Sequence, residues 1–142
     1  NRFGREPVKT FSLVDSPDVV VVLDETLLQV VNVASGVRPD GIVIINTAKP
    51  PDSVELKAAV NIATTNATGC AKEAGLIVAG SVIFNTAILG GFSKATGLVS
   101  MESIEKALLQ HFHGPAADKN VRGAWLAYEA TITLTECQLA CA

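Results

Sequence analysis

Two short aliphatic runs constrain the fold more than any other feature of this sequence. Residues Asp18–Asp24 read DVVVVLD, and Ile42–Asn46 read IVIIN. Each run is too uniformly apolar for a strand that has one solvated face. We therefore expect strands that are buried on both sides, which are typical of a parallel sheet inside an α/β protein.

The segments around these runs predict helices. Asp24 is placed to cap a short helix that follows the first run, and apolar residues recur at helical spacing in the second half of the chain. The expected strands are Pro7–Val14, Asp18–Asp24, Ile42–Asn46 and Val60–Thr64; the expected helical segments are Glu25–Asn32, Asp52–Lys57, Asn66–Ala74, Ile83–Ala95, Ser100–Phe112 and Ala116–Thr131. This alternation predicts one α/β domain over residues 1–142, with a mostly parallel, Rossmann-like sheet flanked by helices.

The composition supports a folded, soluble domain and excludes two function classes. Apolar residues make up 49% of the chain and charged residues 18%, which is enough apolar surface for a core. The formal net charge of −3 gives no support for nucleic-acid binding. No run approaches the ~18 uninterrupted apolar residues of a membrane span.

The three cysteines leave two interpretations open. Cys137 and Cys141 are four residues apart and would share one face of a helix. They would form either half of a metal or cluster site or two small residues near a frayed end. We favour the second, because tetrahedral metal sites usually need four ligands. No signal peptide is visible, and free thiols, Cys70 included, indicate a reducing cytoplasm.

No recognisable catalytic centre emerges from the residues. Gly90-Gly91 lies inside an expected helix, where close helix packing is favoured over ligand contact. His111 and His113 are better explained by the dipole at a helix end than by a metal. The acidic residues that border strand ends each also serve as turn or cap residues: Asp18, Asp24 and Asp40. We predict no catalytic residue and no metal ligand in this chain.

Asn85 and Thr86 stand out because they are polar and open an otherwise apolar helix. They would satisfy free backbone groups of the first helical turn. Alternatively, they would meet a ligand or a partner subunit at that end of the helix. The residues alone leave both interpretations open.

Three segments resemble a known family. They are DVVVVLDETLL (Asp18–Leu28), DGIVIINT (Asp40–Thr47) and FNTAILGGFSKATGLVSMESIEKAL (Phe84–Leu108). They look like the gamma subunit, or gamma domain, of 2-oxoacid:ferredoxin oxidoreductases, of which pyruvate:ferredoxin oxidoreductase is the best-known member. Asp118–Glu129 resembles the closing helix of the family, so the similarity extends from Arg5 to Glu129.

The sequence departs from the family at its N-terminal end. Family members start with a strand and a glycine-rich GxGGQG-like turn, and nothing here corresponds to them. The stretch REPVKTF resembles a segment around an Arg-Gly-x-Pro-Val pattern, with Glu6 in place of part of it. We therefore expect the N-terminal part of the family domain to be absent, remodelled or not represented in this sequence; its absence would leave a sheet edge uncovered.

The resemblance implies a role inside a larger enzyme. Such complexes cleave a 2-oxoacid with thiamine diphosphate and Mg, pass electrons through iron–sulfur clusters to ferredoxin and transfer the acyl group to coenzyme A. The thiamine site and the clusters belong to alpha, beta and delta-type subunits. The resemblance thus implies a gamma subunit that binds no cofactor alone, packs on those subunits and helps enclose the coenzyme A path, with Asn85 and Thr86 as candidate contacts.

The alternative is a stand-alone regulatory module that binds a nucleotide or an acyl-CoA. Its ligand would lie at the strand ends that carry Asp24 and Asn46. The missing glycine turn counts against it, because that turn normally supplies anion-binding amides. In neither case does this chain specify which 2-oxoacid is the substrate.

Overall fold

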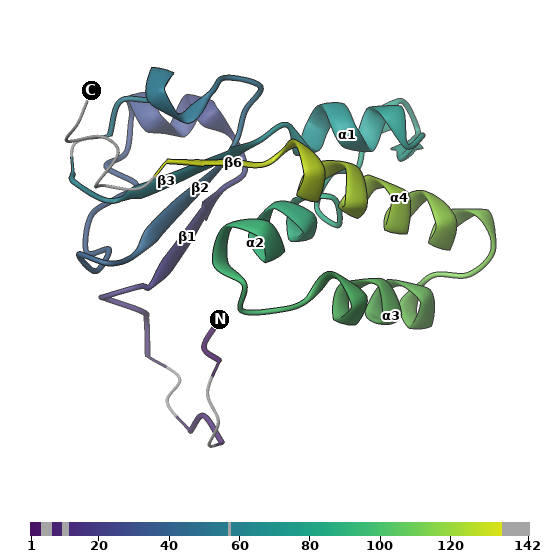
Figure 1. Ribbon diagram of the computed structural model, residues 1–142, viewed down its shortest axis with the longest axis horizontal. Helices are drawn as coiled ribbons and strands as arrows, with labels where there is room; N and C mark the ends of the chain where they lie inside the picture. Colours follow the sequence, from purple (N-terminus) through teal and green to yellow (C-terminus); the bar gives the residue numbers. More distant parts are fainter. Residues whose placement is uncertain (4–6, 10–11, 57, 135–142) are drawn as a thin grey trace.

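A mostly parallel sheet forms one side of the molecule, and the α-helices extend from it on the other side (Figure 1). The computed structural model describes residues 1–3, 7–9, 12–56 and 58–134. Its four-stranded sheet has the order β1-β2-β3-β6, in which β1, β2 and β3 are parallel and β6 runs antiparallel to β3. The strands are β1 (Val19–Val22), β2 (Ile42–Asn46), β3 (Asn61–Thr65) and β6 (Ile132–Leu134). The predicted α/β class with a mostly parallel sheet is confirmed, although β6 was not foreseen.

The α-helices of the described chain all follow β3. They are α1 (Ala67–Glu73), α2 (Ile88–Thr96), α3 (Met101–His111) and α4 (Pro115–Ala130). Among the described residues, the links between the parallel strands contain two 3-10 helices, η1 (Glu25–Gln29) and η2 (Pro51–Ser53), and no α-helix. The helix predicted over Glu25–Asn32 is therefore wrong in type and length, whereas its cap is right: the Asp24 carboxylate accepts a hydrogen bond from the Thr26 N–H.

Different elements cover the two faces of the sheet. Phe92 and Ala95 of α2 pack on the face that carries Ile42 and Ile44. Loops around η1 and η2 cover the opposite face, which carries the alternate residues of β2, with Val43 and Ile45 fully buried. Every residue of β2 is buried, so the prediction of burial on both sides is confirmed for this strand.

The edge strand β1 departs from that prediction. Within the described residues it pairs only with β2. Val22 is 3% exposed, but Val21 is 38% exposed and Leu23 is 46% exposed. Val21 points to the α2 side of the sheet, because side chains alternate along a strand. Among the strands, however, α2 packs mainly on β2 and β3. Burial of Asp18–Asp24 on both sides is therefore wrong for this structure.

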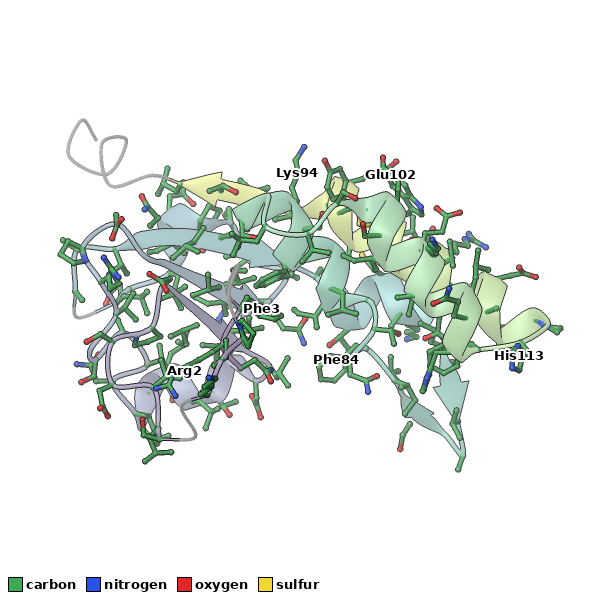
Figure 2. All side chains as sticks on the ribbon, turned by 90° about the horizontal axis from the view of Figure 1, so that it is seen from below. Arg2, Phe3, Phe84, Lys94, Glu102 and His113 are labelled. Carbon is green, nitrogen blue, oxygen red and sulfur yellow. The ribbon has the colours of Figure 1, made fainter. Side chains whose placement is uncertain are left out.

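The strand predicted over Pro7–Val14 is also absent: residues 7–9 and 12–14 form no strand, and residues 10–11 lie outside the described part. The end of this segment contacts Arg2 (Figure 2), whose guanidinium donates to the backbone carbonyls of Ser12 (2.9 Å) and Leu13 (2.8 Å). An alternating pattern forms a strand only beside a partner strand. In the part of the chain that the structure describes, β1 pairs with β2 and with no other strand.

The helix boundaries follow local signals that are visible in the sequence. The side chain of Asn66 accepts from the Gly69 N–H at the start of α1, and Ser100 accepts from the Ser103 N–H at the start of α3. Gly97 ends α2 with φ +63°. The predicted ends of these helices are confirmed to within a few residues, as is the helix predicted over Ala116–Thr131.

The predicted start of α2 is wrong, because the residues before Ile88 extend a β-hairpin and then form a turn: the Ile83 N–H donates to the Leu76 carbonyl (2.8 Å), and residues 85–87 are a turn. Strands β4 (Ile77–Val78) and β5 (Ser81–Val82) pair antiparallel across a two-residue turn. Ala79 (φ +48°) and Gly80 (φ +82°) both adopt positive φ, as a type I′ turn requires. The helix therefore begins at Ile88, not at Ile83.

Helix α4 lies at the centre of the helical region and packs against α1, α2 and α3. A Cβ on Gly90 of α2 would lie 1.8 Å from the Ala124 carbonyl oxygen of α4, and a Cβ on Gly91 would lie 2.7 Å from a methyl group of Thr65 in β3. The packing interpretation of Gly90-Gly91 is confirmed. No helix among the described residues is both long and apolar enough to cross a membrane.

We predict that Gly90→Ala lowers the free energy of unfolding by about 1–3 kcal/mol, since the added methyl collides with backbone. This loss outweighs the gain in helix propensity, about 1 kcal/mol. Gly123→Ala in α4 is the matched control, because its Cβ would meet the flexible end of Leu76 at 2.9 Å and costs less. Urea unfolding followed by circular dichroism measures both; a Gly90→Ala protein as stable as wild type would contradict the packing.

Candidate functional site

The parallel strands β1, β2 and β3 end at one edge of the sheet, where α/β proteins usually bind ligands. A cleft of about 380 Å³ lies at this edge. Its lining combines acidic, amide and hydroxyl side chains with one aromatic ring: Leu23, Asp24, Glu25, Asn46, Thr47, Ala48, Asn66, Thr68 and Phe84. We call this feature the carboxyl-edge cleft.

Asn46 is the buried polar centre of the cleft. Its Nδ2 donates to the Leu23 carbonyl (3.0 Å) and to the Thr68 hydroxyl (2.8 Å), while its Oδ1 accepts from the Thr68 N–H (3.2 Å). The side chain thereby ties the end of β1 and the first turn of α1 to the end of β2. Its amide is engaged within the protein, so a ligand that used it would have to displace these bonds.

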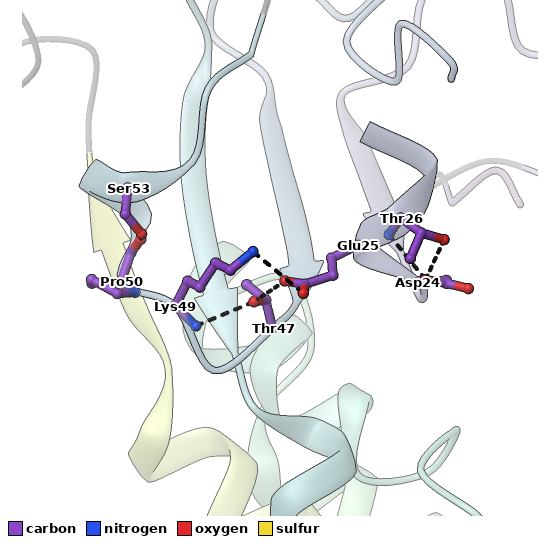
Figure 3. Close-up of polar contacts among 7 residues, drawn as sticks. All are labelled: Asp24, Glu25, Thr26, Thr47, Lys49, Pro50 and Ser53. Carbon is purple, nitrogen blue, oxygen red and sulfur yellow. Dashed lines mark hydrogen bonds and ion pairs between the residues drawn. The ribbon is translucent and has the colours of Figure 1, made fainter. Parts of the chain in front are cut away.

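A second polar network links η1 to the loop after β2 (Figure 3). The Thr47 hydroxyl donates to the Glu25 carboxylate and accepts from the Lys49 N–H at 3.2 Å. The Lys49 ammonium lies 3.4 Å from the other Glu25 oxygen. Asp24 accepts from both the N–H (3.0 Å) and the hydroxyl (2.8 Å) of Thr26. These contacts fix the two loops that flank the cleft.

The hydrogen bonds keep both carboxylates of the cleft ionised. The bond from Thr47, helped by Lys49, lowers the pKa of Glu25 below its ordinary value of 4.5. The backbone and hydroxyl bonds from Thr26 lower the pKa of Asp24 below 3.8. A general acid at neutral pH needs a raised pKa. The two groups therefore suit the role of hydrogen-bond acceptors that position loops.

Asn85 and Thr86 lie in the turn before α2, and neither caps the helix. The Ile88 and Leu89 N–H groups bond to backbone carbonyls of residues 84 and 86 instead. The capping interpretation is therefore wrong.

The Thr86 hydroxyl donates to the Asn120 side chain of α4 at 2.5 Å, and Asn120 is only 5% exposed. Asn85 is exposed and follows Phe84, the aromatic wall of the carboxyl-edge cleft (Figure 2). The two neighbours thus have different surroundings: Thr86 joins α2 to α4, and Asn85 remains open to contact from outside.

The remaining polar candidates lie apart from this cleft. Arg38 pairs with Asp18 (3.4 Å) and Asp40 (3.8 Å), beside the starts of β1 and β2. His111 lies in the last turn of α3, where its ring contacts Phe112 edge-on at 4.8 Å. Among the described residues no three His, Cys, Asp or Glu side chains gather as metal ligands would.

Among the described residues there is one cysteine, Cys70. Cys70 is a free thiol buried in the core beside α4, and burial raises its pKa. Cys137 and Cys141 lie outside the described residues. The two interpretations of the Cys137–Cys141 spacing therefore remain predictions.

Sequence reasoning identified Asp24 and Asn46 but missed Glu25, Thr47, Lys49 and Thr68. A signal for Thr47 was available, because it follows Asn46 directly after a fully buried run. The partners of Thr47 were not visible, since Glu25 lies 22 residues earlier and meets it only when β1 and β2 pair.

Known proteins that this chain resembles belong to one group of oxidoreductases. The family model described as pyruvate ferredoxin/flavodoxin oxidoreductase matches residues 1–130. The gamma subunit common to pyruvate and ketoisovalerate oxidoreductases of Pyrococcus furiosus is 44% identical over 133 residues, covering 92% of this chain and 70% of the relative. The pyruvate synthase subunit PorC of Methanothermobacter marburgensis is 44% identical over 128 residues, covering 90% and 68%.

A solved structure agrees with these relatives. The crystal structure of the pyruvate oxidoreductase subunit PORC of Thermotoga maritima superposes with a TM-score of 0.74 and 34% sequence identity. The match covers 84% of this chain and 66% of the solved chain. This chain thus spans slightly less than two thirds of the solved subunit.

We predict that Asn46→Asp lowers the free energy of unfolding by about 1–3 kcal/mol, because a carboxylate cannot donate to the Leu23 carbonyl and places charge in a buried site. Asn85→Ala is the matched control: this amide is exposed, so we expect a change within about 0.5 kcal/mol. Urea denaturation of both variants measures the difference. Equal stabilities would show that the Asn46 network is not structural.

We also predict that Glu25 contributes to the loss of stability in acid. The folded protein holds the Glu25 proton less tightly than the unfolded chain, so this stabilisation is present above pH 4.5 and is lost as pH falls through the folded pKa. The urea concentration at the unfolding midpoint should therefore change less between pH 6 and pH 3 for Glu25→Gln than for the wild type.

Two further variants identify the cause of that pH dependence. Thr47→Val should flatten it more than Lys49→Met, because the Thr47 hydrogen bond lowers the Glu25 pKa most. The reverse order would assign the effect to the ion pair instead.

Proposed function

Because the chain belongs to the pyruvate ferredoxin/flavodoxin oxidoreductase family, we propose that it is the gamma subunit of a thiamine-diphosphate-dependent 2-oxoacid:ferredoxin oxidoreductase. The complete enzyme would decarboxylate a 2-oxoacid oxidatively and pass the electrons to ferredoxin. Gamma and PorC subunits of pyruvate and ketoisovalerate oxidoreductases, at 39–44% identity, support this assignment. Pyruvate or a branched 2-oxoacid is the substrate class that their names favour.

The role of this chain is assembly, and one observation carries that proposal: aliphatic side chains remain exposed around the edge strand. Val21, Leu23 and Leu98 are 38%, 46% and 64% exposed. Together with Val14 (42% exposed) they form what we call the β1 surface. They lie in and beside a groove of about 790 Å³ between β1, the end of α2 and the N-terminal segment. Contiguous apolar patches of this kind mark interaction sites.

The cofactors of the complex belong to the partner subunits in this proposal. A cubane iron–sulfur cluster is held by four cysteine thiolates, and this chain contains three cysteines. The clusters would therefore reside in partner subunits. The resemblance to the family assigns thiamine diphosphate and Mg to alpha, beta and delta-type subunits as well, where ferredoxin would meet the complex. The free thiol of Cys70 supports a cytoplasmic complex.

The carboxyl-edge cleft is the place where this chain would help enclose the coenzyme A path. Phe84 lines the cleft, and the Asn85 amide beside it is exposed. Asn46 and Thr47, by contrast, already bond within the protein. The same engagement counts against the alternative, a stand-alone module that binds a nucleotide or an acyl-CoA. Calorimetric titration of the isolated chain with coenzyme A and with AMP tests that alternative. A dissociation constant below about 10 μM for either ligand would favour it.

We predict that the chain made alone self-associates or aggregates at micromolar concentration, because the β1 surface stays uncovered. Co-expression with its alpha, beta and delta-type partners should give a soluble complex. Val21→Lys should weaken assembly and also reduce self-association of the isolated chain. Val78→Lys on the β4–β5 hairpin is the matched control, since Val78 is 63% exposed and lies away from β1.

Sedimentation velocity of the isolated chain and co-purification of the complex measure these effects. A stable monomer at micromolar concentration would contradict the assembly role. A complex that tolerates Val21→Lys but is lost with Val78→Lys would place the interface at the hairpin.

We predict further that Asn85→Ala in the assembled complex raises the apparent KM for coenzyme A by about 2–10-fold, the equivalent of one hydrogen bond. The KM for the 2-oxoacid should stay unchanged. Thr86→Val is the control, because its hydroxyl bonds to Asn120: it should lower the melting temperature and leave coenzyme A use intact. Normal assembly of the Asn85→Ala complex with an unchanged coenzyme A affinity would overturn this role of Asn85.

A further inference from the structure

We draw no further inference here: the strongest candidate, the apolar groove of about 790 Å³ between the outer edge of β1, the end of α2 and the N-terminal segment, belongs to the β1 surface already proposed for assembly, and nothing in the structure shows what covers it.

Discussion

The close approach of α2 to both α4 and β3 is the constraint on which the rest of the structure depends. Successive helix residues point roughly 100° apart, so Gly90 and Gly91 open two adjacent sides of one helix. One side admits the Ala124 carbonyl of α4, and the other admits Thr65 of β3. Thr65 in turn donates to the Ala127 carbonyl of α4 at 3.2 Å. Through this contact the helices that follow β3 are attached to the sheet at a fixed distance.

Several fold elements could be predicted because their signals are local. The IVIIN strand is apolar on both faces, and Asn66, Ser100 and Gly97 act on the backbone within a few residues of themselves. The β4–β5 hairpin gave no such signal. Its strands have two residues each, and alanine, the residue type at position 79, rarely adopts positive φ. The apolar residues that follow it at helical spacing therefore extended the predicted helix too far toward the N-terminus.

The candidate site was only partly predictable, because its contacts depend on which elements become neighbours. Asp24 and Asn46 could be identified because each stands at the end of an aliphatic run, which is visible in the sequence itself. The bond between Thr47 and Glu25 exists only once β1 lies parallel to β2. Asn85 is adjacent to Thr86, yet the turn before α2 leaves it exposed and directs the Thr86 hydroxyl to α4. Neither outcome is encoded in residue type or spacing.

The contrast between β1 and β2 shows how position, and not composition, decides burial. The two strands are almost equally aliphatic, but β2 has a strand on each side and cover on both faces, whereas the described β1 has one neighbour and a partly open face. Burial of apolar surface stabilises a protein by about 25 cal/mol per Å², and surface left in water does not contribute this free energy. If a partner covers β1, as the assembly proposal requires, binding adds that free energy to the folded state by mass action. Folding of the sheet and formation of the complex would then be thermodynamically coupled, and the exposed Val21 would be buried only in the assembled state.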